Sequence, residues 1–160
     1  MLLYNRKPTE YRTHYKAVKT TGAAALLSRE GRDCMETRTQ RDYFPILLNL
    51  KDQPCLVIGG GMVAYRKVGS LLQAGARVRV ISPETVAQLE ALADSGDIAL
   101  EKRHYRSGDL KNCRLAFAAT NQRAVNEACR KEAMETGVLL NVVDVPDLCD
   151  FIMPAVHQQG

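Results

Sequence analysis

The chain has 160 residues and a formal net charge of +4, and 46% of its residues are hydrophobic. This length suits one domain of ordinary size. Basic residues are scattered among acidic ones and form no unbroken block, so we expect no nucleic-acid partner. No apolar run approaches the roughly 18–20 residues of a membrane-spanning helix. We therefore expect a cytoplasmic protein without a membrane partner.

The five cysteines are far apart in the chain, and no two of them have a Cys-x-x-Cys spacing. An odd number at such spacings argues against a disulfide framework and against a zinc site. We therefore expect reduced thiols, and we assign no residue as a metal ligand.

Periodic patterns begin near Tyr43, whereas residues 1–40 show none, and we expect these to form a disordered leader outside the domain. A short apolar run at 55–58 predicts a parallel strand, and a helical spacing follows at 62–74, closed by Gly75. Further strands are predicted at 77–81, 98–102, 115–118 and 138–143, with helices at 84–93 and 122–134. This alternation predicts an α/β domain with a doubly wound parallel sheet.

A glycine motif follows the first predicted strand and opens the first helix. Residues 59–64, Gly-Gly-Gly-Met-Val-Ala, satisfy the pattern G-x-G-x-x-[G/A]. In this motif Gly59 makes the tight turn and Gly61 lets the backbone approach a pyrophosphate. The amides of Met62 and Val63, at the start of the helix, offer hydrogen bonds to a phosphate. The context predicts a Rossmann dinucleotide-binding fold, and the alternative is a glycine turn that serves only the fold.

The motif also expects an acidic residue roughly 20 residues later, to bind the adenosine ribose. Glu84 in Ser82-Pro83-Glu84 is slightly late, and its alternative place is the first turn of the next helix. The absence of an arginine at positions 82 and 83 favours NAD over NADP. After the fourth strand, Thr120 is expected either to contact the cofactor or to cap the next helix.

From Tyr43 onward, several short segments together are distinctive enough to indicate a protein family. They are Phe-Pro-Ile-Leu-Leu-Asn-Leu at 44–50, Val-Ile-Gly-Gly-Gly-Met-Val-Ala-Tyr-Arg-Lys at 57–67, Leu-Leu-Gln-Ala-Gly-Ala at 71–76, Ala-Ala-Thr-Asn at 118–121, Asn-Val-Val-Asp-Val-Pro at 141–146 and Phe-Ile-Met-Pro-Ala at 151–155. In these segments the chain resembles the amino-terminal module of siroheme synthase and its stand-alone relatives, the precorrin-2 dehydrogenases. The resemblance covers about three quarters of the chain.

The resemblance implies NAD-dependent oxidation of precorrin-2 to sirohydrochlorin, and in many relatives the insertion of ferrous iron to give siroheme. It therefore implies a tetrapyrrole substrate, ferrous iron as a substrate of the chelatase reaction, NAD as cofactor, and a homodimer for full-length members. The cofactor contacts that it implies fall on Met62, Val63, Pro83 and Glu84.

The family's acid–base aspartate falls on Asp144, directly after the fifth predicted strand. There a carboxylate can accept the proton whose loss accompanies hydride transfer. The alternative is an aspartate that starts a turn before Pro146. Four neighbouring residues form a basic group: Lys102, Arg103, His104 and Arg106. This basic group is expected either to contact substrate carboxylates or to form a solvated edge. Arg66 and Lys67 are expected on the exposed side of the first helix.

We therefore divide the chain into the leader at 1–40, an NAD-binding Rossmann domain at 41–146, and the truncated start of a dimerisation region at 147–160. Two functions compete with the enzyme: an NAD(H)-binding regulatory module without catalysis, and an inactive, truncated remnant of the enzyme. Asp144 with its Asn-Val-Val neighbours distinguishes the enzyme from the regulatory module, which has no need of an acid–base residue.

Overall fold

The computed structural model describes residues 43–153. The predicted leader at 1–40 lies outside these residues, as do positions 154–160 of the predicted dimerisation region. The elements of the described part are, in chain order, β1 (Pro54–Ile58), α1 (Met62–Gln73), β2 (Arg77–Ile81), α2 (Ala87–Asp94), β3 (Ile98–Glu101), β4 (Leu115–Ala118), α3 (Arg123–Thr136), β5 (Leu139–Val142) and the short 3-10 helix η1 (Pro146–Leu148). Strands and helices alternate except between β3 and β4, which a loop connects.

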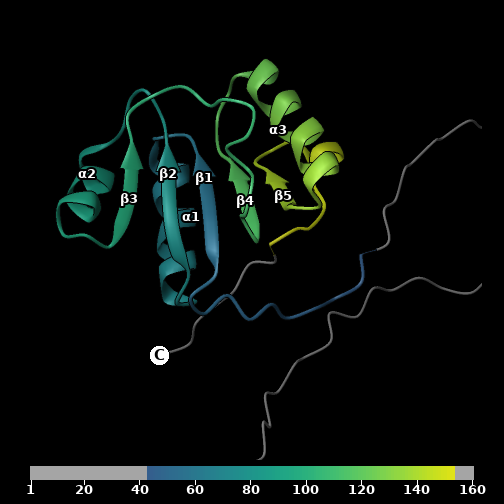
Figure 1. Cartoon of the computed structure of the whole chain (residues 1–160), viewed down its shortest axis with the longest axis horizontal. Helices are drawn as coiled ribbons and strands as arrows, with labels where there is room; N and C mark the ends of the chain where they lie inside the picture. The colour runs from purple at the N-terminus through teal and green to yellow at the C-terminus, as the bar shows by residue number, and fades with distance from the viewer. Residues whose placement is uncertain (1–42, 154–160) are drawn as a thin grey trace, which may run out of the picture. The chain divides into compact units, whose positions relative to one another are not determined.

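The strands form one sheet in the order β3-β2-β1-β4-β5 (Figure 1). Every neighbouring pair is parallel. The chain starts in the centre at β1, runs outward to β3, and then returns to the other side of β1 at β4. This reversal creates a crevice at the carboxyl ends of β1 and β4, where ligands bind in sheets of this kind. The predicted α/β, doubly wound Rossmann architecture is confirmed.

Two apolar cores cover the two faces of the sheet. Side chains of α1 and α2 pack on one face, where Val57 and Phe117 point, whereas α3 packs on the other face, with Leu56 and Ala118. Neighbouring residues of a strand point to opposite faces, so the central strands are buried on both sides. Among the described helices, none is long and apolar enough to cross a membrane.

The turn between β2 and α2 departs from the prediction. Helix α2 begins at Ala87, so the helix expected from residue 84 is wrong at its start. Val86 is extended, and its amide donates to the Gly60 carbonyl at 2.9 Å. The Ser82 hydroxyl donates to the Glu84 carbonyl at 2.6 Å. These contacts fold residues 82–86 against the glycine loop. The other predicted element ends agree to within two residues.

The residues that follow η1 return along β5. Asp150 donates its amide to the Leu140 carbonyl at 2.8 Å and accepts the Leu140 amide at 3.0 Å through its carboxylate. The Asn141 side chain donates to the Phe151 carbonyl at 2.8 Å. The Phe151 ring meets the Phe117 ring edge to face, with centroids 5.5 Å apart. Residues 150 and 151 are thus attached to the Rossmann core, and the domain boundary at 146 stays a prediction.

Candidate functional site: three pockets at the carboxyl edge of the sheet

Three adjoining pockets lie at the carboxyl edge of the sheet. The glycine-loop pocket, of about 490 Å³, lies between residues 58–61, 81–84, 104–105 and 119–122, with Val125. The Asp144 pocket, of about 670 Å³, includes Val63, residues 119–121, the start of α3 and residues 143–145. The Lys67 pocket, of about 260 Å³, includes Lys67 and residues 141–146. Residues 119–121 belong to the first two pockets and residues 143–145 to the last two.

Two glycines of the loop are required by its close packing. Gly59 has a φ of +123°, and a Cβ there would lie 2.2 Å from the Ala119 carbonyl oxygen. A Cβ on Gly60 would lie 1.9 Å from the Glu84 carbonyl oxygen. The motif leaves the middle position free, so motif reasoning missed Gly60. The need for glycine at position 60 becomes clear only from the fold, where the turn after β2 packs against the loop.

Gly61 differs from its two neighbours, because a Cβ there would meet nothing within 4 Å. Gly61 is the N-cap of α1, and Met62 and Val63 are the first residues of the helix. The first amides of a helix have no partner within the helix, and no acidic side chain occupies the first turn of α1. Open space beside such amides fits a pyrophosphate. Binding by these residues stays a prediction.

Pro83 and Glu84 are exposed and line the glycine-loop pocket. Glu84 comes two residues before Val86, the N-cap of α2, so it does not belong to the first helical turn. The predicted alternative, a place in the first turn of the next helix, is therefore wrong. Binding of the ribose by Glu84 stays a prediction.

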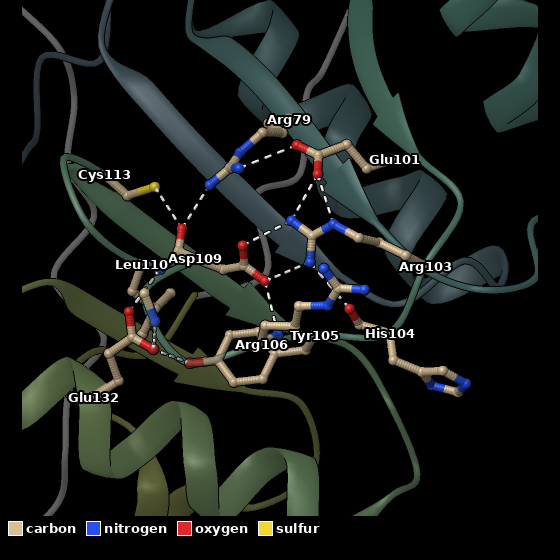
Figure 2. A network of polar contacts seen from close by, with 11 residues as sticks. Arg79, Glu101, Arg103, His104, Tyr105, Arg106, Asp109, Leu110, Cys113 and Glu132 are labelled. Carbon is tan, nitrogen blue, oxygen red and sulfur yellow. Dashed lines mark hydrogen bonds and ion pairs between the residues drawn. The ribbon is translucent and has the colours of Figure 1, made fainter.

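A network of polar contacts holds the loop that closes the glycine-loop pocket. His104 and Tyr105 line this pocket. Glu132 on α3 is 5% exposed, and its carboxylate accepts hydrogen bonds from the Tyr105 hydroxyl and, at 2.9 Å each, from the amides of Gly108 and Leu110 (Figure 2). Burial, and then the contact with Glu132, raise the pKa of Tyr105. The buried carboxylate thus has three donors, and it ties the loop to α3.

Ion pairs also hold this loop in place. Arg103 donates two hydrogen bonds to the Asp109 carboxylate, both at 2.7 Å, and a third to Glu101 at 2.8 Å. Hydrogen bonding from Arg103 lowers the pKa of Asp109 despite the opposing effect of burial. Lys102 pairs with Glu90 at 2.7 Å. Two members of the predicted basic group are therefore paired with acids of this chain.

Sequence reasoning missed Glu132, although a signal was present. Its position falls beside Cys129 and Ala133, two buried apolar residues of α3, so an acidic residue interrupts the apolar face of that helix. A charge on such a face is seldom fully buried unless it is paired. The pattern could have predicted a buried partner network.

Thr120 lines both the glycine-loop pocket and the Asp144 pocket. Its hydroxyl accepts the amide of Gln122, the N-cap of α3, at 3.1 Å, so Gln122 and not Thr120 occupies the cap position. The side-chain amide of Asn126 donates to the Thr120 carbonyl at 3.2 Å. Asn126 is 4% exposed, and its Oδ1 is the buried side-chain oxygen without a partner among the described residues. It lines the Asp144 pocket.

Asp144 is exposed and lines both the Asp144 pocket and the Lys67 pocket. It has a φ of +61°, and the Val145 amide donates to the Val142 carbonyl at 3.2 Å. The chain therefore turns at Asp144, as the turn alternative predicts, and the turn also exposes the carboxylate at the carboxyl end of β5. Within residues 43–153, no hydrogen bond or ion pair involves this carboxylate.

The comparisons with known proteins agree with this geometry. The family described as "Putative NAD(P)-binding" matches residues 46–155. The siroheme synthase of Methylococcus capsulatus is 51% identical over 115 residues, which are 72% of this chain and 24% of that protein. The siroheme synthase of Nitrosococcus oceani is 46% identical over 114 residues, with 71% of this chain and 24% of that protein covered. The chain thus spans about a quarter of the length of these relatives.

A solved structure extends the likeness to three dimensions. The structure of SirC, a precorrin-2 dehydrogenase, matches with a TM-score of 0.67 and 27% identity, over 74% of this chain and 58% of that one. The resemblance to the amino-terminal module of siroheme synthase is confirmed, as is the expectation of a nicotinamide dinucleotide cofactor. The role of the individual glycine-loop residues stays a prediction. The chain belongs to the NAD(P)-binding family that this match defines.

Proposed function

We propose that this chain oxidises precorrin-2 to sirohydrochlorin with NAD as the hydride acceptor. The observation that carries the proposal is the position of Asp144, an exposed carboxylate in the pocket that adjoins the glycine-loop pocket. The relatives named siroheme synthase and precorrin-2 dehydrogenase supply the substrate class.

The residues that would hold the cofactor lie along one edge. Gly59 would make the tight turn, Gly61 would allow the pyrophosphate to approach the backbone, and the amides of Met62 and Val63 would donate to it. Pro83 and Glu84 would lie at the adenosine ribose, where the carboxylate favours a free 2′-hydroxyl over a 2′-phosphate. Thr120 would lie between the two halves of the dinucleotide, because it lines both pockets. Bound NAD supplies the site for the departing hydride.

Asp144 would take the proton. Each precorrin-2 loses one hydride from a C–H bond and one proton, so the substrate is oxidised by two electrons and NAD⁺ is reduced to NADH. A carboxylate in contact with the substrate accepts that proton and releases it to solvent. Aspartate at a φ of +61° is strained relative to glycine. Strained residues cluster at functional sites, which supports a chemical role for Asp144 beyond the turn.

We also propose that the same carboxylate serves ferrochelatase chemistry. Insertion of ferrous iron into sirohydrochlorin releases two pyrrole protons, and Asp144 is a base in reach of that pocket. Iron is a substrate in this reaction. Within residues 43–153, no group of three or more His, Cys, Asp or Glu residues is arranged to hold a metal ion. A homodimer, expected for full-length relatives, stays a prediction for this chain.

The test replaces Asp144 by asparagine, which keeps the size of the side chain but cannot accept a proton at neutral pH. Precorrin-2 and NAD⁺ are added, and sirohydrochlorin and NADH are followed by absorbance. We expect turnover to fall by roughly 10²–10⁴, the usual contribution of a positioned general base. The affinity for NAD, measured by calorimetry, should change little.

A chimera tests the role of Asp144 within a full-length relative, because this chain spans about a quarter of the length of the siroheme synthases that it matches. Residues 43–153 replace the corresponding segment of the Methylococcus capsulatus siroheme synthase, which is 51% identical. Near-parental turnover of Asp144→Asn in an active chimera would remove Asp144 from the mechanism. A chimera that binds NAD but never oxidises precorrin-2 would favour the regulatory module or the inactive remnant.

A further inference from the structure

Lys67 lies on α1 and lines the Lys67 pocket with Asp144, Asn141 and Met153. Lys67 and its neighbour Arg66 were both expected on the exposed side of the first helix; Arg66 is exposed, whereas Lys67 is half-buried. The difference follows from the helix, because consecutive residues lie about 100° apart around its axis. Position 67 faces the segment that returns along β5.

The ammonium of Lys67 has no acidic partner among residues 43–153. Its Nζ lies 5.3 Å from the centroid of the Phe117 ring and 3.6 Å from the Met153 sulfur. These contacts position a cation but do not neutralise it. By contrast, Arg103 and Arg130, which are also partly buried, pair with carboxylates of this chain.

We propose that Lys67 binds a carboxylate of the tetrapyrrole substrate, in the pocket that it shares with Asp144. The inference rests on the proposed function, since it takes precorrin-2 and sirohydrochlorin, which carry many carboxylates, as the ligands. A lysine ammonium is a compact charge that can donate to any carboxylate oxygen within reach. An anion held at Lys67 fixes one edge of the macrocycle beside Asp144. Lys67 thereby orients the ring relative to the base.

The test measures binding of sirohydrochlorin to the full chain in the presence of NAD⁺, by fluorescence titration. Lys67→Gln keeps a polar side chain of similar length and removes the charge. We expect its dissociation constant for sirohydrochlorin to rise by about 10- to 100-fold, as for the loss of a charge-assisted hydrogen bond. Lys67→Arg should restore most of the affinity, because the positive charge returns.

Arg66→Gln is the matched control, because it removes the same charge from the adjacent, exposed position of the same helix. Its affinity for sirohydrochlorin should stay within about twofold of the parent. All three variants should bind NAD as the parent does, which shows that the fold is intact. Equal affinities of Lys67→Gln and Arg66→Gln would overturn the inference and leave the proposed function standing. A parent chain that binds NAD but no sirohydrochlorin would overturn both.

Discussion

The glycine-loop pocket and the Asp144 pocket lie side by side, but they differ in how their polar groups are satisfied. Around the glycine-loop pocket, the Glu132 carboxylate accepts hydrogen bonds from three donors of this chain. The Arg103 guanidinium forms ion pairs with two carboxylates of this chain. Around the Asp144 pocket, the carboxylate of Asp144 and the Oδ1 of Asn126 lack partners within residues 43–153. The polar side chains that frame the glycine-loop pocket thus satisfy one another. The Asp144 pocket presents an exposed carboxylate that a substrate can engage.

We expect the largest effect from a substitution that breaks the hydrogen-bond network around Glu132. Glu132→Ala leaves the Tyr105 hydroxyl and the amides of Gly108 and Leu110 without their acceptor. Unpaired buried donors are costly, so we expect the free energy of unfolding to fall by roughly 3–5 kcal/mol in urea denaturation. Glu135→Ala, on an exposed position of the same helix, should change it by less than about 0.5 kcal/mol. Equal stability of the two variants would mean that the network does not stabilise the loop.

A smaller effect is expected at the glycine loop itself. Gly60→Ala places a Cβ 1.9 Å from the Glu84 carbonyl oxygen, so the turn after β2 must shift. We expect a loss of roughly 2–3 kcal/mol of stability, typical of overpacking, together with weaker NAD binding. Gly61→Ala is the contrasting variant, because its Cβ meets nothing within 4 Å. It should unfold at the parental temperature yet bind NAD less tightly in calorimetry. Parental NAD affinity in Gly61→Ala would argue against the predicted pyrophosphate position.

We expect the smallest effect on stability at Asp144. Glycine adopts the φ of +61° at position 144 without strain, whereas alanine does not. We expect Asp144→Gly to be about 1 kcal/mol more stable than Asp144→Ala in thermal unfolding. Neither should approach the destabilisation of Glu132→Ala. A more stable alanine variant would show that the turn does not constrain this position.

Local patterns predicted most of the fold. Strand β2 was predicted from its alternation of arginine and apolar residues before Ser82-Pro83. Strands β1 and β4 were predicted to within one residue, because each is a short apolar run that is buried in the sheet. The glycine loop was predictable for the same reason, since its motif follows a buried strand. The start of α2 was not, because Val86 donates to Gly60 across the fold instead of continuing a helix toward residue 84.

The features that sequence reasoning missed depend on contacts between distant segments. Gly60 matters because the turn after β2 packs against it, and Glu132 because a loop 22 to 27 residues earlier folds onto α3. Lys67 is half-buried because Phe117 and Met153 meet it from β4 and from the segment after β5. Helical periodicity alone cannot predict such partners. The family resemblance identified Asp144, whereas the fold reveals its positive φ.

Residues 119–121 line two pockets, so a ligand in either pocket would contact the same short segment. Thr120 is tied to α3 through Gln122 and Asn126, so a ligand that moves it on one side also moves the first turn of that helix on the other. Reciprocity then applies: if NAD raises the affinity for sirohydrochlorin by some factor, sirohydrochlorin raises the affinity for NAD by the same factor. By the same linkage, the order in which two ligands bind leaves the final complex unchanged.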